Sequence, residues 1–446
     1  MEKIKETSLN TLRPSVVQGV SSGSAPQGKK LAQIEFGFGT SIQKVEVPEE
    51  NLLGILEPNE VDIDLVGEEE IRRALANPIG APPLGEVLRA GETVAIVTSD
   101  ITRPMPSDLV LPVLLDELVE AGIRREDITV VFGLGSHRRH TPEEIKALVG
   151  ERVYHEVKCI DGDAEDCITM GVTSFGTPVD VVREVAGADR RICLGNVEFH
   201  YFAGYSGGAK AIMPGVSSRA AIQNNHSQMV KAQASAGRLE GNPVREDIEE
   251  AGEICGIDYL INVVLDEKKQ VIKAVAGDSV KAHRQACAFL DRLYKKVLPK
   301  RADIVMVSQG GAPKDLNLYQ TQKALDNAKH AVRKGGIIIL MGSCKEGLGE
   351  EVFEQWIEEA KTSSSMIDRI QEDFQLGGHK AAAIAMVLEE AEIYLVSELP
   401  EDVVKKIFLT PMKTAQEALD KAFEKLGEDA TVLAMPYGGS TLPYVE

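Results

Sequence analysis

Glycines crowd around one lysine in the stretch NVEFHYFAGYSGGAKAIMPG, residues 196–215. Gly207 and Gly208 lie just before Lys210, and such glycines let the backbone approach a ligand and present amide donors to an anion. A phosphate-binding P-loop needs Ser or Thr directly after the lysine, and Ala211 stands there, which excludes it. The apolar neighbours of Lys210 predict partial burial, which lowers the pKa of a lysine and makes its amine nucleophilic. We interpret Lys210 as an amine in close or covalent contact with a cofactor; a solvated lysine behind a glycine turn is the alternative.

Three histidines are candidates for acid–base or metal chemistry. His137 and His200 each follow an expected strand, where an imidazole of ordinary pKa near 6.5 can act as acid or base. Together with His226 they could supply the three protein ligands of a catalytic metal site. Alternatively, a bound cofactor supplies most of the ligands and one imidazole completes the set. The competing interpretation of His137 is an exposed loop residue, and we expect His140 on the surface.

Two further pairs carry charge or amide groups suited to an acid. The loop SDITRPMPS (99–107) holds Asp100 and Arg103, and arginine binds carboxylate or phosphate through two parallel hydrogen bonds. An Asp–Arg pair that caps a turn is the structural alternative. Gln320 and Lys323 lie three residues apart, on one face of an expected helix, where they could recognise a small polyoxygenated acid. A solvated helix face is the simpler interpretation there.

These residues require elements that position them, and short β-branched runs alternate with amphipathic stretches along the chain. Strands are expected at 93–100, 127–137, 190–200, 301–311, 335–344, 391–400 and 430–439, with helices at 107–121, 141–150 and 318–332. This alternation predicts an α/β fold of two α/β domains with mainly parallel sheets and an active-site cleft between them. The expected segments are a polar leader (1–34), an N-terminal α/β domain with the cofactor site (35–295), a C-terminal α/β domain (296–420) and a terminal segment returning to one of the sheets (421–446). Ligands of such sheets bind beyond the carboxyl ends of the strands, where the polar residues cluster.

The composition narrows the class of protein. The 446 residues include 49 Lys and Arg against 69 Asp and Glu, a net charge of −20 that argues against nucleic-acid binding. No apolar run reaches the roughly 20 residues of a membrane span, and the N-terminus lacks the apolar core of a signal peptide. We therefore expect a cytoplasmic protein with no membrane partner. The six cysteines form no CxxC pair and are expected to be reduced, buried and inert.

Taken together, these segments resemble the nickel-dependent lactate racemase family. The matching blocks are SDITRPMPS (99–107), GSHRRHTPEE (135–144), EFHYFAGYSGGAKAIMPG (198–215), NNHS (224–227), INVVLDE (261–267), AGDSVKAH (276–283) and YQTQKA (319–324). They span most of residues 90–325 in the family's order.

The resemblance implies a racemase or epimerase of a 2-hydroxy acid with a nickel pincer nucleotide, a pyridinium mononucleotide whose thioamide and thiocarboxylate groups hold nickel. It implies covalent attachment of this cofactor at Lys210, His226 as the protein ligand of nickel, and His137 and His200 as general acid and base. The remaining implied contacts are Asp100, Arg103, Gly207 and Gly208 for the cofactor, and Arg103, Tyr319, Gln320 and Lys323 for the substrate.

The implied chemistry agrees with the residues. Deprotonating the carbon of a 2-hydroxy acid would create a dianionic enolate, whereas moving that hydrogen as hydride to a pyridinium gives a planar 2-keto acid. Ile101 stands where lactate racemases usually carry His, and Ala209 where they usually carry Arg. We therefore expect a 2-hydroxy acid other than lactate, with a longer or more apolar side chain.

Other readings of the same residues remain open. One alternative is a metal-dependent hydrolase with His137, His200 and His226 as direct ligands, and another is a binding protein without turnover. The expected partners are the small 2-hydroxy acid and the enzymes that make and load the cofactor, with a homo-oligomer as a further expectation.

Overall fold

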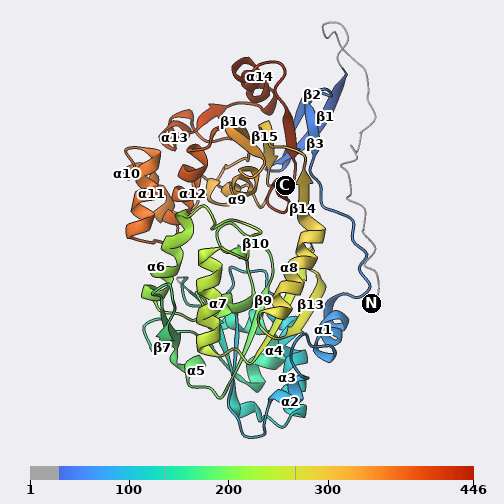
Figure 1. The fold of residues 1–446 in the computed structure, drawn as a ribbon, viewed down its shortest axis with the longest axis vertical. Helices are drawn as coiled ribbons and strands as arrows, with labels where there is room; N and C mark the ends of the chain where they lie inside the picture. Colours follow the sequence, from blue (N-terminus) through green and yellow to red (C-terminus); the bar gives the residue numbers. More distant parts are fainter. Residues whose placement is uncertain (1–29, 136, 267, 446) are drawn as a thin grey trace. The chain divides into compact units, whose positions relative to one another are not determined.

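The computed structural model describes residues 30–135, 137–266 and 268–445 and forms two compact units (Figure 1). Unit 1 comprises the chain up to residue 58, residues 296–367 and the chain from 377 onward. Unit 2 comprises residues 59–295 and 368–376. Each unit is built on a six-stranded, mainly parallel sheet, which confirms the predicted α/β fold class.

Unit 2 carries the glycine-rich stretch, and its sheet has the strand order β13-β12-β9-β4-β5-β6. All neighbours are parallel except β12 and β13. The chain runs from β4 outward through β5 and β6 and then returns to the other side of β4 with β9. In doubly wound sheets, the ligand crevice lies beyond the strand ends at such a reversal of strand order. The strands are β4 (Val94–Ser99), β5 (Ile128–Gly133), β6 (Lys158–Asp161), β9 (Arg190–Asn196), β12 (Tyr259–Leu265) and β13 (Val271–Gly277).

Helices bury the apolar face of this sheet. Helix α3 (Ser107–Glu120) packs Val110, Leu114 and Leu118 into a core with the strand residue Ile96. Thr141 caps the next helix in a capping box with Glu144. The unit's helices are α1 (Gly67–Ala76), α2 (Leu84–Val87), α3, α4 (Pro142–Glu156), α5 (Arg183–Ala186), α6 (Arg219–Ser227), α7 (Pro243–Cys255) and α8 (Lys281–Tyr294). Two short antiparallel pairs complete the unit, β7 (Cys167–Val172) with β8 (Pro178–Val182) and β10 (Phe199–His200) with β11 (Gly204–Tyr205).

The sheet of unit 1 is parallel throughout, with the order β18-β17-β16-β15-β19-β3. Its strands are β3 (Leu52–Ile55), β15 (Ala302–Ser308), β16 (Val332–Met341), β17 (Ala391–Val396), β18 (Thr410–Met412) and β19 (Val432–Met435). Helix α9 (Leu318–Ala328) ends before residue 332, where its prediction ended, because Val332 opens β16. The remaining elements are α10 (Glu351–Glu359), α11 (Ser363–Glu372), α12 (Gly378–Leu388), α13 (Glu401–Lys406), α14 (Ala415–Leu426) and the pair β14 (Lys295–Leu298) with β20 (Leu442–Val445).

The units differ from the predicted domains at the N-terminus. The hairpin of β1 (Leu31–Phe38) and β2 (Ser41–Pro48), together with β3, belongs to unit 1 rather than to a domain spanning 35–295. The reason is non-local pairing, since β3 joins the sheet beside β19, and Phe36 and Val45 pack into the same core as Ile339. Most of the predicted leader lies outside the described residues, and β1 occupies its last positions.

Candidate functional site

Asp100 and His137 form a direct pair beyond the ends of β4 and β5. Asp100 Oδ2 lies 2.5 Å from His137 Nδ1, and Thr102 Oγ1 donates to the other carboxylate oxygen at 2.6 Å. Burial raises the pKa of Asp100, but the hydrogen bond and charge of His137 and the hydroxyl of Thr102 outweigh it, so the pKa is lowered. The carboxylate thus accepts a hydrogen bond from Nδ1–H of His137, and a neutral ring then presents its lone pair at Nε2. Arg103 begins its exposed side chain from the same loop.

His140 is not a surface residue, which corrects the prediction. Its side chain is fully buried, and its Nδ1 lies 2.6 Å from Asp161 Oδ1 at the end of β6. Its Nε2 accepts the backbone N–H of Ile101 at 3.0 Å. A second imidazole–carboxylate pair therefore holds the loop that carries Asp100. Ile101 itself is 44% exposed.

The glycine turn before Lys210 packs closely against the side chains of Asn262 and His283. Gly207 and Gly208 have φ of 74° and 61°, where side chains are strained. A Cβ on Gly207 would lie 2.6 Å from Asn262 Oδ1, and one on Gly208 would lie 3.0 Å from the ring of His283. The N–H of Gly208 donates to Asn262 Oδ1 at 2.8 Å, so this amide is already used within the protein. The geometry thus explains both glycines by backbone conformation and close packing; their predicted contact with a cofactor stays a prediction.

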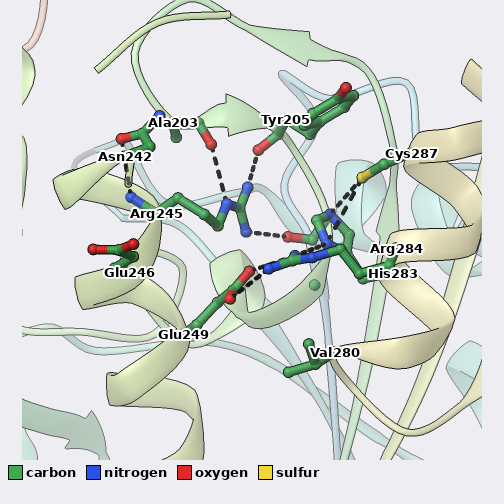
Figure 2. A network of polar contacts seen from close by, with 12 residues as sticks. Ala203, Tyr205, Asn242, Arg245, Glu246, Glu249, Val280, His283, Arg284 and Cys287 are labelled. Atoms are coloured by element: carbon green, nitrogen blue, oxygen red, sulfur yellow. Dashed lines mark hydrogen bonds and ion pairs between the residues drawn. The ribbon is translucent and has the colours of Figure 1, made fainter. Parts of the chain in front are cut away.

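A fully buried arginine of α7 holds the same stretch (Figure 2). The guanidinium of Arg245 donates to the carbonyl oxygens of Ala203 at 3.0 Å, Gly207 at 3.5 Å and Tyr205. Its neighbour Glu249 is occupied by Arg284, at 2.7 and 2.8 Å. Burial lowers the pKa of Arg245 to about 10. Arg245 therefore fixes the backbone leading to Lys210 with backbone acceptors alone.

Lys210 lies in the short 3-10 turn Gly208–Ala211 and is partly buried. Its Nζ lies 5.9 Å from the centre of the Phe202 ring. Burial, and then the positive charges of Arg245 and Arg103, lower the pKa of Lys210 well below its ordinary value. The neutral amine is thus favoured, as an amine nucleophile requires.

His200 ends β10 and is in the same electrostatic environment. Its Nδ1 accepts the N–H of Ala203 at 3.2 Å, so the neutral ring carries its hydrogen on Nε2. Burial, followed by the charges of Lys210 and Arg103, lowers the pKa of His200 well below its ordinary value. His137 and His200 therefore differ, because one presents a lone pair at Nε2 and the other a hydrogen.

His226 lies near the end of α6 and is 7% exposed. Its ring packs edge-on against two aromatic rings, with its centre 5.0 Å from that of Phe202 and 4.8 Å from that of Phe374. Its Nδ1 lies 3.0 Å from Asn225 Oδ1. Among the described residues, no three His, Cys, Asp or Glu side chains are placed to hold a metal ion by themselves. The alternative in which His137, His200 and His226 bind a metal directly is therefore not supported by the geometry.

The predicted substrate residues lie in unit 1, on α9. Lys323 is exposed and Gln320 half-buried. The buried Lys380 donates from Nζ to the carbonyl oxygen of Tyr319 at 2.9 Å and lies 4.4 Å from the centre of its ring. Gln309 donates to the carbonyl oxygen of Gln320 at 3.0 Å. The α9 residues form a group of their own, and their role toward a substrate stays a prediction.

Sequence reasoning missed the residues that support the lysine turn. Asn262 and His283 fall in two of the blocks that match the family, so a signal existed, but no role was assigned to them. Arg245 is in no matched block. Its function depends on the carbonyl groups of a segment some forty positions away, which no local pattern reveals.

A doubly wound α/β unit with an imidazole–carboxylate pair, a second imidazole and a desolvated amine near its strand ends is typical of enzymes that use acid–base chemistry. Comparison with known families narrows this class. The family model described as the lactate racemase N-terminal domain matches residues 38–237, and the lactate racemase C-terminal domain matches residues 297–442. The chain belongs to the lactate racemase family.

Individual lactate racemases are also similar to this chain in sequence and in structure. The chain is 32% identical over 424 residues to a lactate racemase of Thermoanaerobacterium thermosaccharolyticum, covering 92% of this chain and 99% of that one. It is 31% identical over 381 residues to a lactate racemase of Lactiplantibacillus plantarum, covering 83% and 89%. The solved lactate racemase apoprotein from T. thermosaccharolyticum superposes with a TM-score of 0.84 at 31% identity, over 92% of this chain and 100% of that one. A Thermotoga maritima crystal structure, at 20% identity and a TM-score of 0.62, covers 86% of this chain and 100% of its own and shares the fold.

The described part of the chain contains no helix that is both long and apolar enough to cross a membrane. All six cysteines are free; four are buried, and Cys159 and Cys167 are half-buried. Burial raises the pKa of these last two thiols to about 11, which keeps them protonated and unreactive at neutral pH.

Proposed function

We propose that the protein is a racemase or epimerase of a 2-hydroxy acid other than lactate, with a nickel pincer nucleotide joined to Lys210. The observation that carries this proposal is the state of that amine. Lys210 follows a rigid glycine turn, and burial together with two guanidinium groups keeps its pKa low. Membership of a racemase family known to use this cofactor supports the same assignment.

The residues of unit 2 fit the cofactor by their chemistry. The neutral amine of Lys210 suits a thioamide linkage, and the buried imidazole of His226 suits a nickel ligand. Asp100 and Arg103 are the proposed polar contacts from the loop after β4. When bound, the nucleotide would supply an acceptor and donor of hydride, so that a 2-keto acid lies between the two enantiomers.

The chain's own residues handle the hydroxyl proton. In one direction, His137 accepts this proton at Nε2, because Asp100 holds its Nδ1 hydrogen and stabilises the imidazolium that forms. His200 donates a hydrogen bond from Nε2 to the same oxygen as it becomes a carbonyl, and the imidazolium of His137 returns the proton to that oxygen when hydride comes back. To act as the base for the opposite enantiomer, His200 must give up the hydrogen bond from Ala203, so that its hydrogen can move to Nδ1.

Two positions favour a substrate larger than lactate. Ile101 places an exposed apolar side chain directly after Asp100. Ala209 is 6% exposed and packs against Gly252 of α7. A Cβ added at Gly252 would lie only 2.6 Å from the Cβ of Ala209. The arginine usual at position 209 has no room in this packing. The loop after β4 therefore offers apolar surface, and the turn before Lys210 lacks one cation, so we propose a longer or more apolar substrate side chain. Tyr319, Gln320 and Lys323 remain the proposed substrate residues of α9.

The test is racemisation by the full chain produced together with the enzymes that make the cofactor. Single enantiomers of lactate and of larger 2-hydroxy acids are incubated in D2O, and the products are separated by chiral chromatography. The proposal predicts faster racemisation of a larger acid, with the original hydrogen retained at C2. Deuterium at C2 would instead mean deprotonation at carbon, and racemisation confined to lactate would refute the substrate assignment. Lys210→Ala and His137→Ala should each abolish turnover.

The loading enzymes, a cytoplasmic location and assembly into a homo-oligomer are parts of the same proposal. Size-exclusion chromatography with light scattering tests the last of these. A purely monomeric protein would contradict it.

A further inference from the structure

A fully buried carboxylate of unit 2 accepts hydrogen bonds from a cluster of polar side chains. Asp247 of α7 is 0% exposed. Its Oδ1 accepts from Thr173 Oγ1 at 2.6 Å, and its Oδ2 accepts from Thr177 Oγ1 at 2.7 Å and from Asn225 Nδ2 at 2.8 Å. Gln228 adds a longer contact to Oδ2 at 3.4 Å. Both carboxylate oxygens therefore act as acceptors toward the surrounding donors.

This carboxylate determines how the amide of Asn225 is turned. Asn225 is also fully buried, and its nitrogen Nδ2 faces two oxygens, Asp247 Oδ2 and the carbonyl of Val244 at 3.1 Å. Neither oxygen has a hydrogen to give, so only the NH2 end of the amide satisfies them. Turning the amide over would set its oxygen against both acceptors, at the cost of two buried hydrogen bonds. The amide oxygen Oδ1 must therefore point the other way.

Asn225 Oδ1 in turn meets His226 Nδ1, at 3.0 Å. An amide oxygen only accepts, so the hydrogen of the neutral imidazole must lie on Nδ1, and Nε2 then carries the lone pair. A metal ligand needs this form of the ring, and a partner on the other ring nitrogen commonly fixes it.

We infer that Asn225, oriented by Asp247, is a positioning residue that holds His226 in the tautomer whose Nε2 can ligate a metal. The use of that nitrogen for nickel rests on the proposed function, whereas the tautomer itself is a property of this chain. Helices α6 and α7 are thereby joined at the site, with the aromatic rings of Phe202 and Phe374 fixing the imidazole from its sides.

The test reads the tautomer directly in the cofactor-free full chain. The protein is labelled with ¹⁵N-histidine, and two-bond ¹H–¹⁵N correlations distinguish a protonated ring nitrogen from an unprotonated one at a pH where the ring is neutral. His226→Gln removes one of the eight histidine signals and so assigns it. The wild type should show a protonated Nδ1 and an unprotonated Nε2. A wild-type ring protonated on Nε2 would overturn the inference.

Matched variants separate the hydrogen bond from the packing. Asn225→Leu removes the acceptor and should shift the ring toward the Nε2–H form. Asn224→Leu is the control, since this neighbouring amide donates to Thr177 and not to His226. An unchanged tautomer in Asn225→Leu would refute the assignment. Asp247→Ala should give a mixture of both forms, because the amide then loses one of its two orienting acceptors.

A second measurement uses the loaded protein. With its positioning residue removed, Asn225→Leu should lose nickel to a chelator about 10- to 100-fold faster than the wild type, the usual effect of losing such a partner. Asn224→Leu should match the wild type. The two proposals fail separately. A cofactor-free ring protonated on Nδ1, in a chain that never acquires nickel, refutes the proposed function alone. A cofactor-free ring protonated on Nε2, in a chain that does acquire nickel, refutes only the positioning role.

Discussion

Replacing Arg245 with methionine should destabilise unit 2 strongly without touching any group that contacts the substrate. Met has a similar length but cannot donate a hydrogen bond, so the carbonyl oxygens of Ala203 and Tyr205 lose their close donor and Gly207 loses a longer one. The carbonyl oxygen of Ala203 keeps the backbone N–H of Tyr205 as a donor, at 2.9 Å, so the variant removes one of its hydrogen bonds and not all of them. A hydrogen bond to a charged group contributes roughly 1.5–3 kcal/mol, so the two shorter bonds give a loss of about 3–6 kcal/mol, reduced by the relief of a desolvated charge.

Urea unfolding followed by circular dichroism measures this loss, and hydrogen exchange locates it. The amides of residues 203–210 should exchange faster in Arg245→Met than in the wild type, while those of the unit 1 sheet stay unchanged. Arg245→Lys should fall between the two, because a single ammonium cannot reach all three carbonyls. Arg284→Met is the control: it removes a cation from the same network but leaves the carbonyls bonded. If Arg245→Met unfolds at the urea concentration of the wild type, the hydrogen bonds from Arg245 to the backbone carbonyl groups do not contribute to stability.

Three further predictions concern single residues. Gly207→Ala should cost about 2 kcal/mol or more in unfolding free energy, because it combines a positive φ with a Cβ 2.6 Å from Asn262 Oδ1; unchanged thermal unfolding would contradict this. Asp303→Asn tests a pH dependence of stability. Burial raises the pKa of Asp303, but Arg333 and Thr431 outweigh burial and hold the pKa at about 2. The wild type should therefore have the larger unfolding free energy above the ordinary pKa of 3.8, and this difference should disappear as the pH falls toward 2. Urea midpoints across that range check it, and an advantage that persists at the acid end would refute it. Ala209→Arg should lower stability by about 1–3 kcal/mol through overpacking against α7 and fail to increase racemisation of lactate.

Strand ends were predictable from the sequence because their pattern is local. Alternating apolar runs placed β4, β5 and β9 within a few residues, and the rule for parallel sheets then brought the residues after them to one edge. Asp100 and His137 are consequently bonded to each other, although 37 positions separate them. The close packing around Lys210 was also foreseeable from its apolar neighbours.

Interactions between distant segments were not predictable in this way. His140 looked like a surface residue because its partner Asp161 comes from the end of β6, a strand that the sequence pattern did not indicate. The residues of the β1–β2 hairpin group with unit 1 rather than with the N-terminal domain expected at 35–295. Nothing near them in the sequence reveals that β3 pairs with β19. The orientation of His226 depends on Asp247, which lies on a different helix and whose other partners come from a third segment.

The central claim is that the amine of Lys210 carries the cofactor. The decisive measurement is intact and peptide mass spectrometry of the full chain, made together with the cofactor-producing enzymes, with nickel quantified on the same sample. We predict an added mass confined to the peptide that contains Lys210, near-stoichiometric nickel, and the loss of both in Lys210→Ala. An unmodified Lys210 in a sample from a working pathway, or nickel that stays bound in Lys210→Ala, would contradict the account.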